Sequence, residues 1–448
     1  MQPGDGRSVH RAGRGAVASL VVTAVPDLAR NDTRTTAAPP VDLGAGRGPD
    51  WLDRYLSDSL GELVQFRRQL HRHPELAFAE RRTTDRIEQA LAAAGITGRR
   101  LPGGTGFVAD LNPDAPGPLI GLRADIDALP LQEASGLPFA SEVPGTAHAC
   151  GHDVHTTVLL GTALALAAAP HPVGRVRLLF QPAEESMDGG AAALVQAGAV
   201  DDVDLLFALH CEPRTPVGKV GLKVGPITST ADSIEIRVSG PGGHTSRPHL
   251  TADVVNALGL LATNLPLLLT RRLDPRAAAV LVWGQIRAGE AENAIPQSGV
   301  LRGTLRVMRR DAWDTAGELI TELVGAILEP TGVQYQLSVE RGVPPVENDA
   351  YTTALLRAGV VSALGADAVT EAEQSTGAED FADLLEHAPG TLARLGVWDG
   401  EGQQSDLHSA AFRADERAIA VGVRTLVHTV LAAAGEPAVL PPAAGRTG

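Results

Sequence analysis

The spacing of apolar residues near the start of the chain predicts a pair of amphipathic helices. Over residues 51–73, leucine or phenylalanine recurs at three- and four-residue steps, at Leu52, Leu56, Leu60, Leu63, Phe66 and Leu70. The first helix should end at His73, because a residue that precedes proline disfavours the α conformation. A second helix is predicted over residues 83–94, where Gly95 ends it.

The next apolar runs predict a buried sheet. Strands are expected at residues 107–111, 118–122, 175–180 and 203–209. Residues 155–169 are apolar on nearly every side and predict a buried helix, and residues 190–197 predict a short one. Three of the strands run into polar residues, namely Asp125 and Asp127, Glu184 and Glu185, and His210. Active sites of open α/β sheets lie at such carboxyl ends of strands.

A different pattern interrupts the first one between residues 226 and 343. It predicts strands at 233–239, 277–286, 300–307 and 333–339 and helices at 252–271 and 312–328, the former with a possible kink at Pro266. This β-α-β-β-α-β order is that of a ferredoxin-like unit. Beyond residue 344 helix and strand return, with a last strand at 392–397. We therefore expect an α/β protein with a central mixed sheet flanked by helices and an inserted ferredoxin-like α+β domain.

Length and composition set the boundaries of these parts. A chain of 448 residues is too long for one ordinary core. The expected segments are a disordered N-terminal extension, the first part of the main domain, the inserted domain, the second part of the main domain and a disordered tail, at 1–48, 49–225, 226–342, 343–436 and 437–448. The net charge of −15 argues against nucleic acid or an anionic membrane as a partner. No apolar run approaches the ~20 residues that a membrane span needs.

The cysteines and the N-terminus bear on location. Cys150 and Cys211 each lie near a histidine, which suits metal chemistry in a reducing compartment better than a disulfide. Arg11 and Arg14 precede a short apolar run at 16–25, but no clear cleavage site follows it. We expect a cytoplasmic protein, with secretion through residues 1–30 as the alternative.

Residues 148–155, of sequence HACGHDVH, hold metal-binding side chains that packing does not require. The thiolate of Cys150 and the imidazole of His152 together favour zinc or a similar transition metal. The alternative is a buried cysteine with a histidine nearby in the loop. His148, Asp153 and His155 are then candidates to orient the ligands or to start the buried helix.

The remaining polar residues at strand ends can complete such a site. Of Glu184 and Glu185, one carboxylate can bind metal while the other acts as general base. The alternative is a solvated acidic pair at a helix start. His210 and His408 each follow an apolar strand or its loop, although a lone histidine there is more often structural. With Cys150 and His152, these residues suffice for two metal ions ~3.5–4 Å apart.

The inserted domain holds a further histidine, His244, in the glycine-rich segment 240–249. A donor imidazole at this position could stabilise a tetrahedral oxyanion. The alternative is a turn with an exposed histidine.

Eight motifs together resemble the aminoacylase/carboxypeptidase metallopeptidase family, and most closely its amidohydrolase branch of hippurate hydrolases, N-acyl-amino-acid amidohydrolases and indoleacetyl-amino-acid hydrolases. They are HRHPE at 71–75, LRADIDALP at 122–130, HACGHDVH at 148–155, FQPAEE at 180–185, GGHTSRPH at 242–249, ENAIP at 292–296, GAEDF at 377–381 and LHS at 407–409. The departures are small: Ala147 stands where the branch usually has Met, and Gln297 where Asp is common.

The resemblance implies a role for each matching residue. The metal ligands would be Cys150, His152, Glu185, His210 and His408. Glu184 would be the general base and acid, and Asp127 would orient a neighbouring ligand. In the inserted domain, which the family uses as a lid or dimerisation domain, His244 would complete the site, and Asn293 and His249 would bind substrate.

The function expected from this resemblance is hydrolysis of the amide bond of N-acyl-amino acids, such as N-acetyl or N-benzoyl derivatives. It needs two divalent metal ions, which the sequence leaves open among Zn, Mn, Co and Ni. The expected partners are this small-molecule substrate and a second copy of the chain, as a homodimer through the lid domain. The alternatives are a dipeptidase or carboxypeptidase, an N-acetyl-diaminopimelate-type deacylase, and a catalytically silent metal-binding protein.

Overall fold

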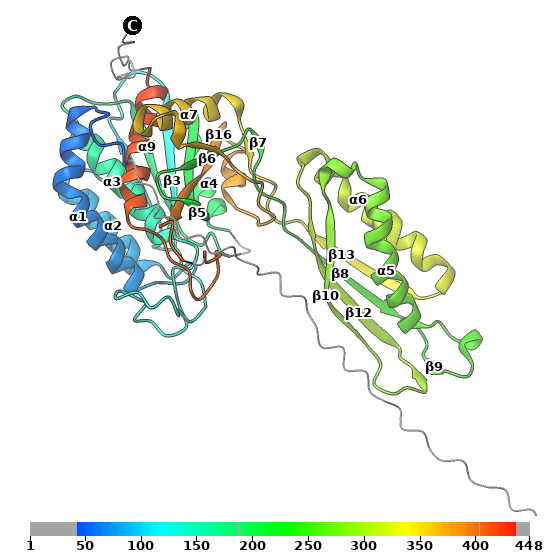
Figure 1. The fold of residues 1–448 in the computed structure, drawn as a ribbon. Helices are drawn as coiled ribbons and strands as arrows, with labels where there is room; N and C mark the ends of the chain where they lie inside the picture. The colour runs from blue at the N-terminus through cyan, green and yellow to red at the C-terminus, as the bar shows by residue number, and fades with distance from the viewer. Residues whose placement is uncertain (1–42, 187–188, 403, 436–448) are drawn as a thin grey trace, which may run out of the picture. The chain divides into compact units, whose positions relative to one another are not determined.

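The computed structural model describes residues 43–186, 189–402 and 404–435, and its larger sheet is mixed (Figure 1). The strand order is β1-β2-β4-β3-β5-β16-β6-β15. Strands β3, β4, β5 and β16 at the centre run parallel, while β1 and β2 at one edge and the β6–β16 pair are antiparallel. The bounds are β1 Gly98–Arg100, β2 Phe107–Leu111, β3 Leu119–Asp125, β4 Arg175–Gln181, β5 Leu205–Pro216, β6 Val220–Leu222, β15 Val369–Glu371 and β16 Gly390–Trp398.

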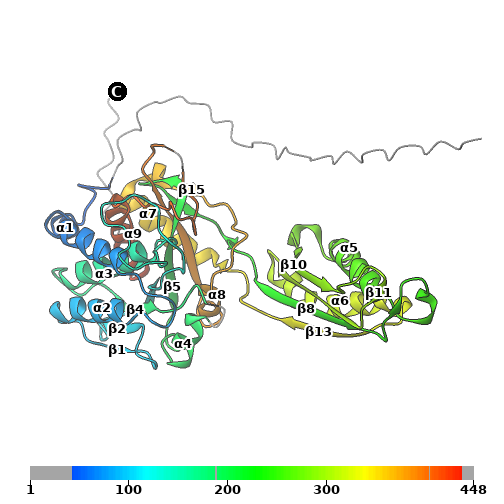
Figure 2. The same cartoon turned by 90° about the horizontal axis from the view of Figure 1, so that it is seen from below.

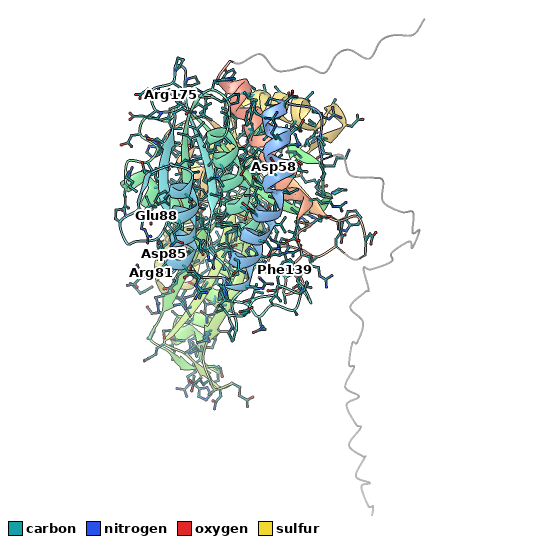
Figure 3. The ribbon with its side chains drawn as sticks, turned by 90° about the vertical axis from the view of Figure 1, so that its left-hand side faces the viewer. Asp58, Arg81, Asp85, Glu88, Phe139 and Arg175 are labelled. Atoms are coloured by element: carbon teal, nitrogen blue, oxygen red, sulfur yellow. The ribbon has the colours of Figure 1, made fainter. Side chains whose placement is uncertain are left out.

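Helices cover both faces of this sheet and form a separate apolar core on each (Figures 1 and 2). One face carries α1 Asp50–Arg72, α2 Arg81–Ala93, α3 His152–Ala167, α7 Ala350–Leu364 and α9 Arg417–Ala433. The other face carries α4 Gly190–Gln196 and α8 Phe381–Leu384. The polar faces of α1 and α2, which carry Asp58 and Glu88, are turned toward the viewer in Figure 3. The predicted central mixed sheet with flanking helices is therefore what the structure shows.

Two element boundaries differ from the prediction in ways that matter for the site. Strand β5 runs on to Pro216, so His210 lies inside a strand and not after its end. The predicted end at residue 209 is wrong because the next strand neighbour, β16, pairs with β5 through Glu212. Helix α3 begins at His152, three residues before the predicted start, so His152 belongs to its first turn.

The inserted segment forms a four-stranded antiparallel sheet of order β10-β12-β8-β13. Its elements are β8 Asp232–Ser239, α5 Val254–Arg272, β10 Val280–Ala288, β12 Ser298–Arg306, α6 Arg310–Leu328 and β13 Gln334–Glu340. Side chains along β8 alternate between buried and more exposed, and the buried set packs with the apolar faces of α5 and α6 into a third core. This is the ferredoxin-like arrangement that the element order predicts.

Helix α5 is long and apolar enough, by length and composition alone, to cross a membrane. Its buried residues, however, pack against the strands of the inserted sheet, as the core helix of an α+β unit does. Pro266 lies inside this helix, which continues to Arg272.

The inserted segment joins the larger sheet through a short antiparallel ladder. Strand β7, Gly225–Pro226, pairs with β14, Glu347–Asn348, so that Pro226 lies opposite Glu347. The backbone N–H of Ile227 donates to the carbonyl oxygen of Val346 at 2.9 Å and extends this ladder by one step. The predicted domain boundaries, at 225/226 and 342/343, fall near it and stay a prediction.

Most of the two terminal segments that are expected to be disordered lies outside the described residues. Of the N-terminal segment, residues 43–48 are described, and the carbonyl oxygen of Gly48 accepts a hydrogen bond from Nε2 of buried His428 at 2.8 Å.

Candidate metal centre

A left-handed glycine places the first two candidate ligands. Gly151 precedes α3 with φ of 90°, and a Cβ atom built on it would lie 2.7 Å from Sγ of Cys211. Only glycine can adopt this left-handed backbone and leave room for the Cys211 side chain without strain. The turn brings Cys150 and His152, on either side of Gly151, to the same site at the ends of the parallel strands.

Five candidate ligands from four segments of the chain meet there in overlapping sets. Ligand atoms of Cys150, His152 and His210 all lie within 4.8 Å of one another, and Sγ of Cys150 lies 3.5 Å from Nε2 of His210. A second set within the same limit joins Cys150 to Glu185 and His408, and Nε2 of His408 lies 3.0 Å from Oε1 of Glu185. Thiolate, imidazole and carboxylate donors in this mixture suit zinc and related divalent ions.

The surroundings of Nε2 of His152 test independently whether a metal ion fits this site. Its Nε2 atom is buried and makes no hydrogen bond to any residue that the structure describes. Oxygen atoms of Asp125, Glu184 and Glu185 lie 3.7–3.9 Å away from it. A buried ring nitrogen without a hydrogen bond, facing carboxylates and a thiol, fits a cation between them.

Asp127 holds two of the candidate ligands in place, and Asp125 orients the neighbouring His155. Oδ1 of Asp127 lies 3.2 Å from Nδ1 of His152, and its Oδ2 accepts the N–H of Glu185 at 3.0 Å. Asp125 lies 2.6 Å from Nδ1 of His155, whose Nε2 accepts the N–H of Cys211 at 2.7 Å. A carboxylate on Nδ1 leaves Nε2 of His152 to face the other candidate ligands.

The loop of His408 is fixed to the loop of Cys150. His408 has a left-handed backbone with φ of 58°, and its N–H donates to the carbonyl oxygen of Ala149 at 2.9 Å. The hydrogen bond to Glu185 raises the pKa of the His408 imidazole. Residues more than 200 positions apart in the sequence are joined at one point in this way.

Glu184 lies in a buried cluster of acids. Its carboxylate is within 4.8 Å of those of Glu379 and Asp380. Burial, followed by the negative charges of Glu379 and Glu185, raises the pKa of Glu184 well above its ordinary value. Burial likewise raises the pKa of Asp380 to about 7, against the opposing effect of Arg123. A carboxyl group that holds a proton so readily has the property that a general base and acid requires.

Arg123 is the cation at the centre of this acid cluster. Its guanidinium donates to Asp125 at 2.7 Å, to Glu379 at 2.9 Å and to Asp380 at 3.0 Å, and its Nε donates to Gln181. These residues lie in the family motifs, but the sequence alone predicts no role for them. An arginine inside an apolar strand was the available signal, because a buried charge requires a partner.

These groups line a cavity of about 530 Å³ at the ends of the parallel strands. Its walls include Cys150, Glu184, Glu185, His210, Glu379, Asp380, Arg394 and His408. Thr228 and Gly342, from the connections to the inserted segment, and Arg306, at the end of β12, line another part of it. The cavity has room for a small molecule next to the candidate ligands.

The predicted site residues of the inserted segment lie in three short segments. His244 is exposed in β9, Gly243–His244, which pairs with β11, Ala294–Ile295. The N–H of Thr245 donates to the carbonyl oxygen of Asn293 at 3.2 Å. His249 is exposed in the short 3-10 helix Pro248–Leu250. His244, Asn293 and His249 are not among the residues that line the cavity, so their roles stay predictions.

Comparison with known proteins identifies the family. Residues 121–432 match the model of peptidase family M20/M25/M40, and the chain belongs to this family. It is 37% identical over 361 residues to the N-acetylcysteine deacetylase of Bacillus subtilis (strain 168), which covers 80% of this chain and 93% of that protein. The resemblance that the motifs indicate is confirmed.

A second relative is longer than this chain. The putative glutamate–cysteine ligase 2-3 of Rhodococcus jostii (strain RHA1) is 52% identical over 366 residues, which are 82% of this chain and 46% of that protein. The chain therefore spans about half the length of this relative.

Among solved structures, the fold matches the YXEP protein of Bacillus subtilis with a TM-score of 0.74 and 34% identity, over 84% of this chain and 98% of that one. That protein is described as a dinuclear metal binding peptidase from the M20 family.

Proposed function

We propose that this protein hydrolyses the amide bond of N-acyl-amino acids to a carboxylic acid and a free amino acid, with two divalent metal ions. The observation that carries the proposal is the meeting of Cys150, His152, Glu185, His210 and His408 beside the largely buried acid Glu184. When bound, such ions polarise the scissile carbonyl and make water acidic enough to ionise near neutral pH. The donor set is compatible with Zn, Mn, Co or Ni.

The residues of the chain supply the proton transfers. Glu184 takes a proton from the attacking water and passes it to the leaving nitrogen. Its neighbours Glu379 and Asp380 raise its proton affinity, so that it can hold this proton between the two steps. Asp127 keeps Nε2 of His152 directed at the other ligands through its contact with Nδ1.

The names of the relatives support an N-acyl-amino acid as substrate. Two Bacillus subtilis proteins that are 37% and 38% identical are named as deacetylases of N-acetylcysteine. A Geobacillus stearothermophilus protein that is 37% identical over 298 residues is named N-acyl-L-amino acid amidohydrolase. N-Acetylcysteine is therefore the first substrate to test.

A second candidate function is that of a carboxypeptidase or dipeptidase. It is favoured by two relatives from Saccharolobus solfataricus, 34% identical, that are named thermostable carboxypeptidases. Comparing hydrolysis of N-acetyl, N-benzoyl and dipeptide substrates separates the two candidates.

For the inserted segment, residues 226–342, we propose the role of a lid and dimerisation domain. The proposal is supported by its own core and by the neighbouring exposed groups of His244, His249 and Asn293, which suit contacts to a substrate. A His244→Ala variant should lose turnover but keep its metal content. Light scattering on the purified protein tests the homodimer.

The decisive experiment replaces Glu184 with glutamine. The variant should lose ~10²–10⁴-fold in kcat while its metal content, measured by mass spectrometry, stays that of the wild type. Glu318→Gln, on the exposed face of α6, is the matched control and should keep full activity. Near-normal turnover of the Glu184 variant would refute the assignment of the base.

A further inference from the structure

Arg394 is a buried cation at the candidate metal centre that has no role in the proposed proton transfers or among the candidate metal ligands. It lies in β16 opposite His210 of the parallel strand β5, so the two side chains emerge on the same face of the sheet. Only 6% of Arg394 is exposed, and it lines the cavity together with Cys150 and Glu184.

Most acids around Arg394 already have other cationic or ionisable partners, and Glu184 faces Nε2 of His152 at 3.9 Å. Glu379 and Asp380 pair with Arg123, and Glu185 pairs with His408. Glu212, which follows His210 in β5, pairs with Arg214 at 3.2 Å. Among the residues that the structure describes, Arg394 has no hydrogen-bond acceptor and no ion-pair partner for its guanidinium.

A guanidinium in this position is costly unless an anion completes it. Burial limits the water that can reach its five N–H donors, which face the cavity, and lowers the pKa of Arg394. Divalent ions at the neighbouring ligands would add further positive charge to the same cavity. The planar fork of arginine matches the two oxygens of a carboxylate and binds them with paired hydrogen bonds.

We propose that Arg394 binds a carboxylate of the substrate and so makes the enzyme selective for anionic amides. This inference rests on the proposed function, whose substrates contain such a group. The carboxylate comes either from the amino-acid half, next to the leaving nitrogen, or from a dicarboxylic acyl half. Arg394 is then a specificity-determining residue that acts mainly on binding.

Three substrates separate the two sources. N-Acetyl-L-alanine has a carboxylate on the amino-acid half, N-succinyl-L-alaninamide has one on the acyl half, and N-acetyl-L-alaninamide has none. Arg394→Gln should lower kcat/KM by about 10- to 100-fold for the substrate whose carboxylate Arg394 binds, chiefly through KM. The neutral amide should be cleaved as by the wild type, and Arg394→Lys should recover part of the loss.

Arg214→Gln is the matched control, because it removes a nearby positive charge from β5 that is exposed and already paired. It should leave the kinetics of all three substrates unchanged. An equal loss on charged and neutral substrates in Arg394→Gln, or no loss on either charged substrate, would overturn the proposal. Thermal melting of each variant shows whether it is folded. If Arg394→Gln is unfolded, the same comparison of the three substrates is made with Arg394→Lys.

Binding measured without turnover separates this proposal from the proposed function. Calorimetry on the metal-bound Glu184→Gln protein measures the dissociation constant of N-acetyl-L-alanine or N-succinyl-L-alaninamide. Adding Arg394→Gln to this variant should raise that constant by about 10- to 100-fold. If the wild type cleaves none of the amides yet this difference is present, the proposed function fails and the carboxylate site stands. If the wild type cleaves them but the difference is absent, the carboxylate site fails.

Discussion

Replacing Arg123 with methionine should destabilise the folded protein by about 3–5 kcal/mol, the usual cost of removing one partner from a buried ion pair. Arg123 is 2% exposed and donates to Asp125, Glu379 and Asp380. Methionine fills a similar volume but leaves these three buried acids without their shared cation. Arg272→Met is the matched control, because the Arg272–Glu322 pair is half exposed and should contribute only about 0–1 kcal/mol.

Urea unfolding of the metal-free proteins measures the difference. With an m-value of about 3 kcal/mol/M, the midpoint of the Arg123 variant should fall by about 1–1.7 M, and that of the control by no more than about 0.3 M. Equal midpoint shifts in the two variants would refute the claim that Arg123 holds the acid cluster together.

The pH dependence of the same variant gives a second check. Arg123 lowers the pKa of Asp380, which burial raises to about 7, so its removal should raise that pKa further. A carboxyl group with a raised folded-state pKa stabilises the fold at low pH and loses that contribution as the pH rises through the pKa. The stability defect should therefore be larger at pH 8 than at pH 5, and a defect independent of pH would contradict this.

Three further changes have defined outcomes. Burial raises the pKa of Glu80 from 4.5 to about 7, so its stabilising contribution is lost as the pH rises through this range; the melting temperature of Glu80→Gln should gain on that of the wild type between pH 5 and pH 8, and a constant difference would contradict this. Gly151→Ala should lower both metal content and melting temperature, because its Cβ would press on Cys211; unchanged metal content would show that the turn tolerates a side chain. Chelation of the purified protein should lower its melting temperature by mass action, and re-addition of Zn²⁺ or Mn²⁺ should restore it, whereas a melting curve insensitive to chelator would argue against a metal site at these residues.

Local patterns in the sequence were enough to predict the elements but not their neighbours. The leucine spacing of residues 51–73 closely predicts α1, and the apolar run at 107–111 matches β2. Periodicity shows which face of an element is buried, but it does not show what lies against that face. The sheet order and the length of β5 depend on pairing with β16, which is about 180 residues later in the chain.

In the candidate site, too, residues in one local motif are predictable, whereas contacts between distant segments are not. Cys150 and His152 are predictable because they lie in one short loop, and the family motifs extend the set to Glu185, His210 and His408. The contacts of Arg123 with Glu379 and of His408 with Glu185 join segments more than 200 residues apart, which no local pattern encodes. Arg394 was missed although its sequence context is a readable signal, since a charged residue within an apolar strand must face either a partner or a cavity.

The β7–β14 ladder brings the two ends of the inserted segment together at one place. Because Pro226 and Glu347 lie opposite each other in antiparallel register, the main chain leaves and re-enters the larger sheet at a single place, as it would through a hairpin. A short turn across this place would leave the host strands in register, and Cys150, His152, Glu185, His210 and His408 all lie outside the excised part. A fold built in this way can gain, lose or exchange its insertion in evolution without redrawing the path of the chain around its metal-binding residues.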